Sequence, residues 1–135
     1  MERLPMVNVA VLASGRGSNL EALLQAQRQD GLGPARVAVV VSDRGDAQAL
    51  ELARASHVEA LFLDPAGLTR EQYDARLADE LRTRGIGLIV LAGFMRVLSP
   101  ALVRAFRDRI VNIHPTLLPS FPGLHGQRQA LDWGV

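Results

Sequence analysis

Five short apolar runs, each separated from the next by a stretch of helical periodicity, restrict the fold of this 135-residue chain more than any other feature. The runs cover residues 7–13, 37–41, 60–63, 86–92 and 110–113. Continuous apolar runs rich in β-branched residues are typical of strands that are buried on both faces of a sheet. Strands that alternate with helices predict an α/β fold, a Rossmann-like, doubly wound parallel sheet with helices on both faces.

Helix-start signals mark several of the stretches between the runs. The segments SNLE (18–21) and TREQ (69–72) have the spacing of a capping box. The pair Ser99-Pro100 is a cap followed by proline at the first helical position. The predicted helices cover residues 18–30 and 46–55, a segment from 69 onward with Tyr73, Leu77 and Leu81 on one face, residues 99–106, and residues 127–133.

The unusual residues of the chain gather in the loops that follow three of the runs, after residues 13, 92 and 113. In doubly wound sheets, ligands bind beyond the carboxyl ends of the strands. We therefore expect these three loops to form one ligand-binding edge of the sheet, and each of them holds one of the three clusters described next.

The first cluster is SGRGSN, at residues 14–19. Gly15 and Gly17 allow a tight turn and a close approach of the backbone, and the helix N-terminus that follows favours a phosphate group. A plain tight turn with a capping serine uses the same residues. A dinucleotide-binding fingerprint, with Asp43 as its acidic residue, needs a third glycine where Leu20 stands, so the sequence disfavours an NAD site.

The second cluster, AGFMRVL at residues 92–98, continues the most hydrophobic run. Apolar side chains at the ligand edge of a sheet can form the wall of a site for a flat organic ligand, while backbone groups supply the polar contacts. Core packing that extends past the strand explains the same residues, Phe94 above all. Both interpretations stay open on the residues alone.

The third cluster is NIHPTLLP, at residues 112–119. Asn112 and His114 alternate along a predicted strand, so their side chains point to the same side, with Cα atoms about 6–7 Å apart. An amide there can bind a developing oxyanion, and an imidazolium can donate a hydrogen bond or a proton to it. Pro115 favours extended backbone at His114. A structural histidine is the alternative, but its place at the ligand edge favours a catalytic role. His57 is predicted at the surface.

Composition excludes several classes of protein. Fifteen basic and fourteen acidic residues leave a net charge of +1, which does not favour a nucleic-acid partner. The absence of cysteine excludes disulfides and thiolate metal sites. No apolar run approaches the roughly 18 residues that cross a bilayer, and the N-terminus lacks a signal-peptide pattern. We expect a single domain, residues 1–135, in a cytoplasmic protein that binds neither membrane nor nucleic acid.

Taken in order, the motifs SGRGSN (14–19), AGFMRVLSP (92–100) and NIHPTLLPSFPGLHG (112–126) resemble the phosphoribosylglycinamide formyltransferases of purine synthesis. The segment TREQYD (69–74) also matches, and the resemblance runs from about residue 7 to the end of the chain. Asn-x-His-Pro followed by Leu-Leu-Pro belongs to the wider group of folate-dependent formyltransferases. The Gly-Arg-Gly-Ser-Asn loop narrows the resemblance to the enzymes that act on glycinamide ribonucleotide. The resemblance implies the formyltransferase fold.

The reaction implied by the resemblance transfers a formyl group from the co-substrate 10-formyltetrahydrofolate to the amine of glycinamide ribonucleotide. The reaction needs no metal and no covalent enzyme intermediate. The resemblance is also compatible with a homodimer. Matching positions imply the site residues: Asn112 and His114 for catalysis, with His114 as the proton donor; Gly17, Ser18 and Asn19 for the ribonucleotide phosphate; and Arg70, Met95, Arg96, Val97, Leu98 and Asn112 for the folate.

The end of the chain departs from the family pattern. The family uses an aspartate, in a loop beyond the matched segment, that favours the protonated histidine, and the chain stops at Val135 before that loop. We therefore expect a C-terminally incomplete, nucleotide-binding N-terminal part of the formyltransferase domain, with little or no activity by itself. Two alternatives are a methionyl-tRNA formyltransferase-like enzyme, which the charge balance disfavours, and a non-catalytic nucleotide-binding fragment.

Overall fold

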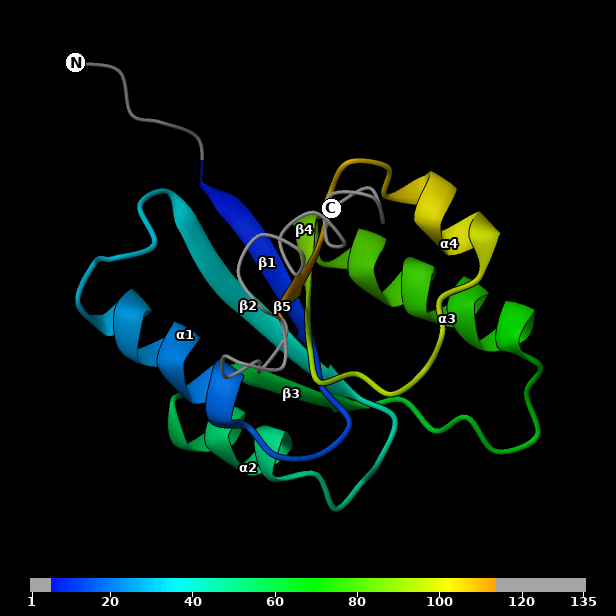
Figure 1. Ribbon diagram of the computed structural model, residues 1–135, viewed down its shortest axis with the longest axis horizontal. Coiled ribbons are helices and arrows are strands. Elements are labelled where there is room, and N and C mark those ends of the chain that lie inside the picture. The colour runs from blue at the N-terminus through cyan, green and yellow to red at the C-terminus, as the bar shows by residue number, and fades with distance from the viewer. Residues whose placement is uncertain (1–5, 114–135) are drawn as a thin grey trace, which may run out of the picture.

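The computed structural model describes residues 6–113 of the chain, shown in Figure 1. The predicted helix at 127–133 lies outside the described residues. The elements follow in the order β1 (Val7–Leu12), α1 (Ser18–Arg28), β2 (Ala35–Ser42), α2 (Gln48–Ala55), β3 (Glu59–Phe62), α3 (Arg70–Thr83), β4 (Ile86–Ala92), α4 (Pro100–Ala105) and β5 (Ile110–Ile113). All neighbouring strands are parallel, in the order β3-β2-β1-β4-β5, so the predicted α/β fold is confirmed.

The helices cover both faces of the sheet, as the doubly wound prediction requires. Figure 1 shows α1 and α2 on one side of the strands and α3 and α4 on the other. The chain first builds β1, β2 and β3 outward in one direction, then returns to place β4 on the opposite side of β1. This reversal between β1 and β4 is the point at which doubly wound sheets bind their ligands.

Strand β1 contributes to two hydrophobic cores, one on each face of the sheet. Ala10 and Leu12 pack in the core under α3 and α4, together with Tyr73. Val9 and Val11 pack in the other core, with residues of α1 and α2. Side chains alternate between the two faces of a strand, so a strand between two helical layers must be apolar at every position. This requirement accounts for the apolar run over residues 9–13, which follows Asn8.

Side-chain caps begin α3 and α4, as predicted. The Thr69 hydroxyl accepts a hydrogen bond from the backbone N–H of Gln72 at 3.1 Å, and the Gln72 side chain accepts one from the backbone N–H of Thr69 at 2.9 Å. These two bonds complete a capping box. The Ser99 hydroxyl accepts from the N–H of Leu102 at 3.2 Å, and Pro100 is the first residue of α4. Both predictions are therefore confirmed.

The capping box predicted at Ser18 and Glu21 is wrong. Gly17 is the N-cap of α1, and its carbonyl accepts from the N–H of Glu21 at 2.6 Å. Among residues 6–113, no side chain caps this helix. A Cβ atom on Gly17 would lie 2.3 Å from Leu52 Cδ1 and 3.3 Å from Ala49 Cα. The N-cap is therefore one residue earlier than predicted, while α1 itself begins at Ser18 as predicted. The N-cap lies so close to α2 that only glycine fits without a shift.

The structure also tests the predicted position of His57 and the predicted start of the second helix. His57 is exposed, as predicted, and turns the chain after α2 with a φ of 59°. Helix α2 begins at Gln48, two residues later than the predicted start. Within residues 6–113, no helix is both long enough and apolar enough to cross a membrane.

Arg84, which caps the C-terminus of α3, ties this helix to the edge strand β3. Its Nε and Nη2 atoms donate to the two carboxylate oxygens of Glu59 at 2.9 and 2.6 Å. Its Nη1 atom donates to the Glu80 carboxylate at 2.7 Å. The hydrogen bond from Arg84 lowers the pKa of the Glu59 carboxyl below its ordinary value. This ion-pair network holds the edge of the sheet against the helix that covers it.

We expect Arg84→Met to lower the free energy of unfolding by about 1 kcal/mol near neutral pH, the upper end for a partly exposed ion pair. The pKa of Glu59 is lower in the folded than in the unfolded state, so its contribution is complete above the unfolded pKa and disappears as the pH falls through the folded one. Urea denaturation of both proteins at about pH 7 and about pH 3 measures the difference. A loss of equal size at both pH values would assign the effect to packing of the Arg84 stem.

Candidate active site

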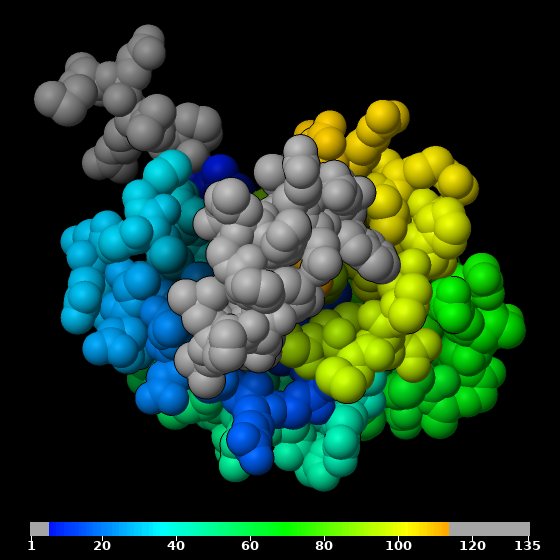
Figure 2. Space-filling model, viewed as in Figure 1, coloured from blue at the N-terminus to red at the C-terminus, as the bar shows by residue number. Residues whose placement is uncertain are grey.

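Two of the three loops singled out from the sequence meet at one edge of the sheet. Strands β1 and β4 are hydrogen-bonded neighbours, with Leu12 opposite Leu91, so the loops that follow them leave the sheet together. Figure 1 shows both loops at the lower edge of the sheet, and Figure 2 shows blue atoms of the first loop close to yellow-green atoms of the second. The carboxyl end of β5 lies next to β4 on its other side. The predicted ligand edge is therefore formed by adjacent segments.

Ser14 joins the first loop to the second. Its backbone N–H donates to the Gly93 carbonyl at 3.2 Å, and its hydroxyl oxygen accepts from the backbone N–H of Met95 at 2.8 Å. Ser14 is 3% exposed. It belongs to the first sequence cluster, but the sequence predicts no role for it, because its partners lie about eighty residues further along the chain.

The 15–19 loop, which carries the predicted phosphate-binding residues, rests on α2. The Gly15 carbonyl accepts from the N–H of Ala49 at 3.2 Å, and Gly17 is buried against the same helix. Ser18 is exposed and Asn19 is half-buried, both in the first turn of α1. Because no side chain of the described residues caps α1, the N–H groups of its first turn can donate to a ligand. Such a helix start favours an anion.

The 95–98 segment, which carries four of the predicted folate-binding residues, alternates between solvent and core. Met95 is 81% exposed and Val97 is 60% exposed. Leu98, like Phe94 just before the segment, packs against the core under α3 and α4. Core packing thus explains Phe94 and Leu98, and only Met95 and Val97 present apolar side chains outward. A site for an organic ligand needs apolar surface and a few polar groups. The exposed apolar side chains and the neighbouring anion-favouring loop together provide both.

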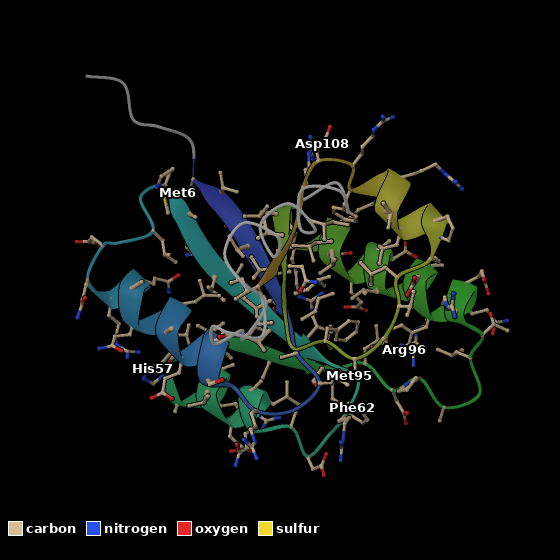
Figure 3. All side chains as sticks on the ribbon, viewed as in Figure 1. Met6, His57, Phe62, Met95, Arg96 and Asp108 are labelled. Carbon is tan, nitrogen blue, oxygen red and sulfur yellow. The ribbon has the colours of Figure 1, made fainter. Side chains whose placement is uncertain are left out.

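Helix α3 holds the middle and the end of this segment. The Arg96 guanidinium lies over the Tyr73 ring, 4.2 Å from its centroid, and Figure 3 shows Arg96 on the loop beside Met95. Tyr73 is fully buried. The buried Asp74 carboxylate accepts from the backbone N–H of Ser99 at 2.5 Å. Sequence reasoning missed Tyr73 and Asp74, although both lie in the TREQYD segment that carries the family resemblance.

A cluster of buried polar atoms lies beneath Arg96. Burial, and then the charge of Asp43, raise the pKa of the Tyr73 hydroxyl well above its ordinary value, so it stays protonated at neutral pH. Within the described part of the chain, the Tyr73 hydroxyl, one Asp43 carboxylate oxygen and Arg96 Nε are buried without a hydrogen-bond partner. The charge on Asp43 therefore acts on the hydroxyl of the ring that lies under Arg96, an effect that the sequence does not indicate.

The remaining predicted site residues come from three places. Arg70 is the first residue of α3 and is exposed. Asn112 lies in β5, half-buried, with its Cα paired to that of Leu91 in β4. His114 lies outside the described residues, so its predicted place beside Asn112 stays a prediction. Residues 6–113 contain no group of three or more histidine or acidic side chains that could hold a metal ion.

Comparison with known proteins identifies the family. Residues 7–135 match the profile of a protein family described as formyl transferase. The chain belongs to the formyl transferase family. The match covers nearly the whole sequence, including all three clusters, so the resemblance drawn from the motifs is confirmed.

The relatives of this chain include phosphoribosylglycinamide formyltransferases and trifunctional purine biosynthetic proteins. It is 43% identical over 129 residues to the phosphoribosylglycinamide formyltransferase of Escherichia coli K12, covering 95% of this chain and 60% of that one. It is 45% identical over 132 residues to the trifunctional purine biosynthetic protein adenosine-3 of Drosophila pseudoobscura pseudoobscura, covering 96% of this chain and 10% of that protein. The chain thus spans less than two thirds of the length of these relatives.

Solved structures agree with the fold of the formyl transferase. The crystal structure of glycinamide ribonucleotide transformylase 1 from Symbiobacterium toebii superposes with a TM-score of 0.78 at 52% identity, covering 96% of this chain and 61% of that chain. The corresponding enzyme from Geobacillus kaustophilus gives 0.78 at 42% identity, covering 96% and 69%. The predicted formyltransferase fold is therefore confirmed.

Proposed function

We propose that this formyl transferase carries the sites for transfer of a formyl group from 10-formyltetrahydrofolate to the amine of glycinamide ribonucleotide, in de novo purine synthesis. One observation carries the proposal. A loop suited to an anion and a segment suited to an organic ligand are hydrogen-bonded to each other through Ser14, so their ligands would lie side by side. Relatives named phosphoribosylglycinamide formyltransferase support this choice of substrates.

The ribonucleotide phosphate is assigned to Gly17, Ser18 and Asn19. Gly17 brings the backbone of the loop against α2, and the two residues after it are in the first turn of α1, whose N–H groups have no side-chain cap. A phosphate there gains backbone hydrogen bonds and the favourable end of the helix dipole. The Asn19 side chain can add a further donor.

The folate is assigned to the 95–98 segment, Arg70 and Asn112. Within the described part of the chain, the backbone N–H groups of Arg96, Val97 and Leu98 have no hydrogen-bond acceptor, so they can donate to a heterocycle. Met95 and Val97 supply exposed apolar surface. Arg70, exposed at the start of α3, supplies a cation for the carboxylates of the folate tail. These residues fit a flat ligand with a charged tail.

Asn112 and His114 are assigned to the formyl oxygen. When bound, the formyl donor supplies an electrophilic carbonyl carbon attached to N10. The Asn112 amide donates to the carbonyl oxygen before and after charge develops, whereas a protonated His114 donates most strongly once the oxygen is negative. The new bond joins the amine nitrogen to the formyl carbon, and the bond from that carbon to N10 breaks. The amine loses one proton and N10 gains one, with His114 as the proposed donor.

The proposal also covers the location of the enzyme, its oligomeric state, and its use of metals and macromolecular partners. We place it in the cytoplasm, and a homodimer is compatible with it. The two donors at Asn112 and His114 stabilise the oxyanion, so the proposed reaction uses no metal ion. Neither a membrane nor a nucleic acid takes part.

Replacing Asn19 by alanine tests the assignment of the two ligands. We expect glycinamide ribonucleotide to bind about ten- to a hundredfold more weakly, because one hydrogen bond to a charged group is lost, while a folate analogue binds nearly unchanged. Isothermal titration calorimetry with each ligand measures both affinities.

The matched control is Gln25→Ala, which removes an exposed amide from α1 away from its N-terminus and should change neither affinity. A ribonucleotide phosphate bound elsewhere, with the 15–19 loop empty at saturation, would contradict the assignment. Tight binding of methionyl-tRNA without binding of the ribonucleotide would favour the related tRNA enzyme.

A further inference from the structure

We propose that Ser14 is a positioning residue that couples the binding of the ribonucleotide to the binding of the folate. The inference rests on the proposed function and adds to it a residue that needs to touch neither ligand. Ser14 would make each ligand bind more tightly when the other is present, because it directly precedes the 15–19 loop in the chain and is hydrogen-bonded to the backbone at Gly93 and Met95.

The two hydrogen bonds of Ser14 run in opposite directions across the gap between the loops. Its backbone N–H donates to Gly93, at 3.2 Å, and its hydroxyl accepts from Met95, at 2.8 Å. At 3% exposure, Ser14 gives water little access to replace these partners. Ser14 therefore connects the backbone that enters the 15–19 loop to the backbone that enters the 95–98 segment.

The neighbours of Ser14 are fixed on both sides. The Ala13 N–H donates to the Val41 carbonyl at 3.0 Å, which extends the sheet by one residue, and the Gly15 carbonyl accepts from Ala49 at 3.2 Å. Any displacement of the 15–19 loop relative to α2 therefore displaces Ser14 relative to the sheet, to which Ala13 is hydrogen-bonded. The hydroxyl moves with it, and so does the Met95 N–H that it holds.

The 95–98 segment is anchored at its two ends by different parts of the fold. Ser14 holds the Met95 end, and the buried Asp74 carboxylate holds the backbone N–H of Ser99 at the other. The three N–H groups that the proposed function assigns to the folate lie between these anchors. Asp74 belongs to α3, which is on the other face of the sheet from α1 and α2, so within residues 6–113 the Ser14 anchor is the one that joins the segment to the ribonucleotide loop.

We expect coupling because a ligand orders the segment that it binds, and this ordering costs conformational entropy. A ligand that orders the 15–19 loop also orders Ser14 and Met95. A second ligand at the 95–98 segment then binds a part of the chain that is already ordered. Linkage requires the effect to be reciprocal. A single neutral hydrogen bond limits its size, and we expect a coupling factor of about two to five.

The experiment uses inorganic phosphate as the probe of the ribonucleotide loop, because phosphate is too small to touch a folate bound next to it. The affinity of 5-deazatetrahydrofolate, which carries no formyl group to transfer, is measured by calorimetry with and without saturating phosphate. Sodium chloride at matched ionic strength is the reference. We expect phosphate to tighten folate binding about two- to fivefold in the unmodified protein and to have no effect in Ser14→Ala.

Two further variants separate coupling from general destabilisation. Ser99→Ala removes another buried serine hydroxyl, which accepts from Leu102 at 3.2 Å, but it leaves the bond between the loops intact, so the coupling should persist. Ser14→Thr keeps the hydroxyl and should restore the coupling. If Ser14→Ala fails to fold, Met95→Pro removes the donor of the same hydrogen bond and should also abolish the coupling.

Each outcome has a defined consequence. If phosphate tightens folate binding equally in Ser14→Ala and in the unmodified protein, or in neither, the inference is overturned and the proposed function stands. If the unmodified protein binds neither phosphate nor the folate analogue, the proposed function fails and the inference fails with it. Loss of coupling in Ser99→Ala as well would assign the effect to stability and overturn the role of Ser14.

Discussion

Alanine at Asn112 or at His114 should lower kcat by about 10²–10³ in an active enzyme that contains this chain, the scale seen for the loss of one oxyanion donor. The two side chains are predicted to point to the same side of a strand, and Asn112 lies in β5 next to the strand that leads into the 95–98 segment. Both can then reach the formyl oxygen. Steady-state kinetics with both substrates at saturation measures each loss.

The double variant Asn112→Ala/His114→Ala decides whether the two groups share that oxygen. If they do, the two losses of transition-state stabilisation should not add fully, because removing one donor already exposes the common target. Arg107→Ala, at an exposed position in the turn before β5, is the matched control and should retain full activity. Strictly additive losses, or a loss confined to ribonucleotide affinity, would show that the two side chains act on different atoms.

Alanine at Gly17 should lower the free energy of unfolding by about 1–3 kcal/mol and weaken ribonucleotide binding by about tenfold or more. The new Cβ would lie 2.3 Å from Leu52 Cδ1 and 3.3 Å from Ala49 Cα. Leu52 can turn aside, but the α2 backbone cannot, so the loop must shift away and carry its N–H groups off the phosphate. Thermal unfolding and calorimetric titration measure the two effects.

Gly15→Ala is the matched control for this prediction. A Cβ on Gly15 meets no atom of residues 6–113 within 4 Å, so we expect a change in stability of no more than about 0.5 kcal/mol and an intact ribonucleotide site. The double variant Gly17→Ala/Leu52→Ala should recover part of the lost stability, because the closest contact is gone. Equal effects of alanine at the two glycines would mean that backbone freedom, and not the space beside α2, explains Gly17.

Local features of the sequence were enough to predict most of the fold. The strands are mostly apolar because helices cover both faces of the sheet. The caps at Thr69 and Ser99 depend on partners three residues away. Signals of this kind involve only neighbouring residues, so they can be read in order along the chain. The cap predicted at Ser18 failed because its outcome depends on Leu52 and Ala49, which belong to another helix.

The candidate site divides in the same way. By itself, the sequence determined which loops carry the unusual residues, because a parallel sheet places the carboxyl ends of its strands at one edge. Only the tertiary structure decided how those loops are joined. Ser14 meets Met95 across 81 residues, and Asp74 meets Ser99 across 25. Such contacts depend on the order of the strands and on which helix covers which face, and both are set by the packing of the whole domain rather than by any local pattern.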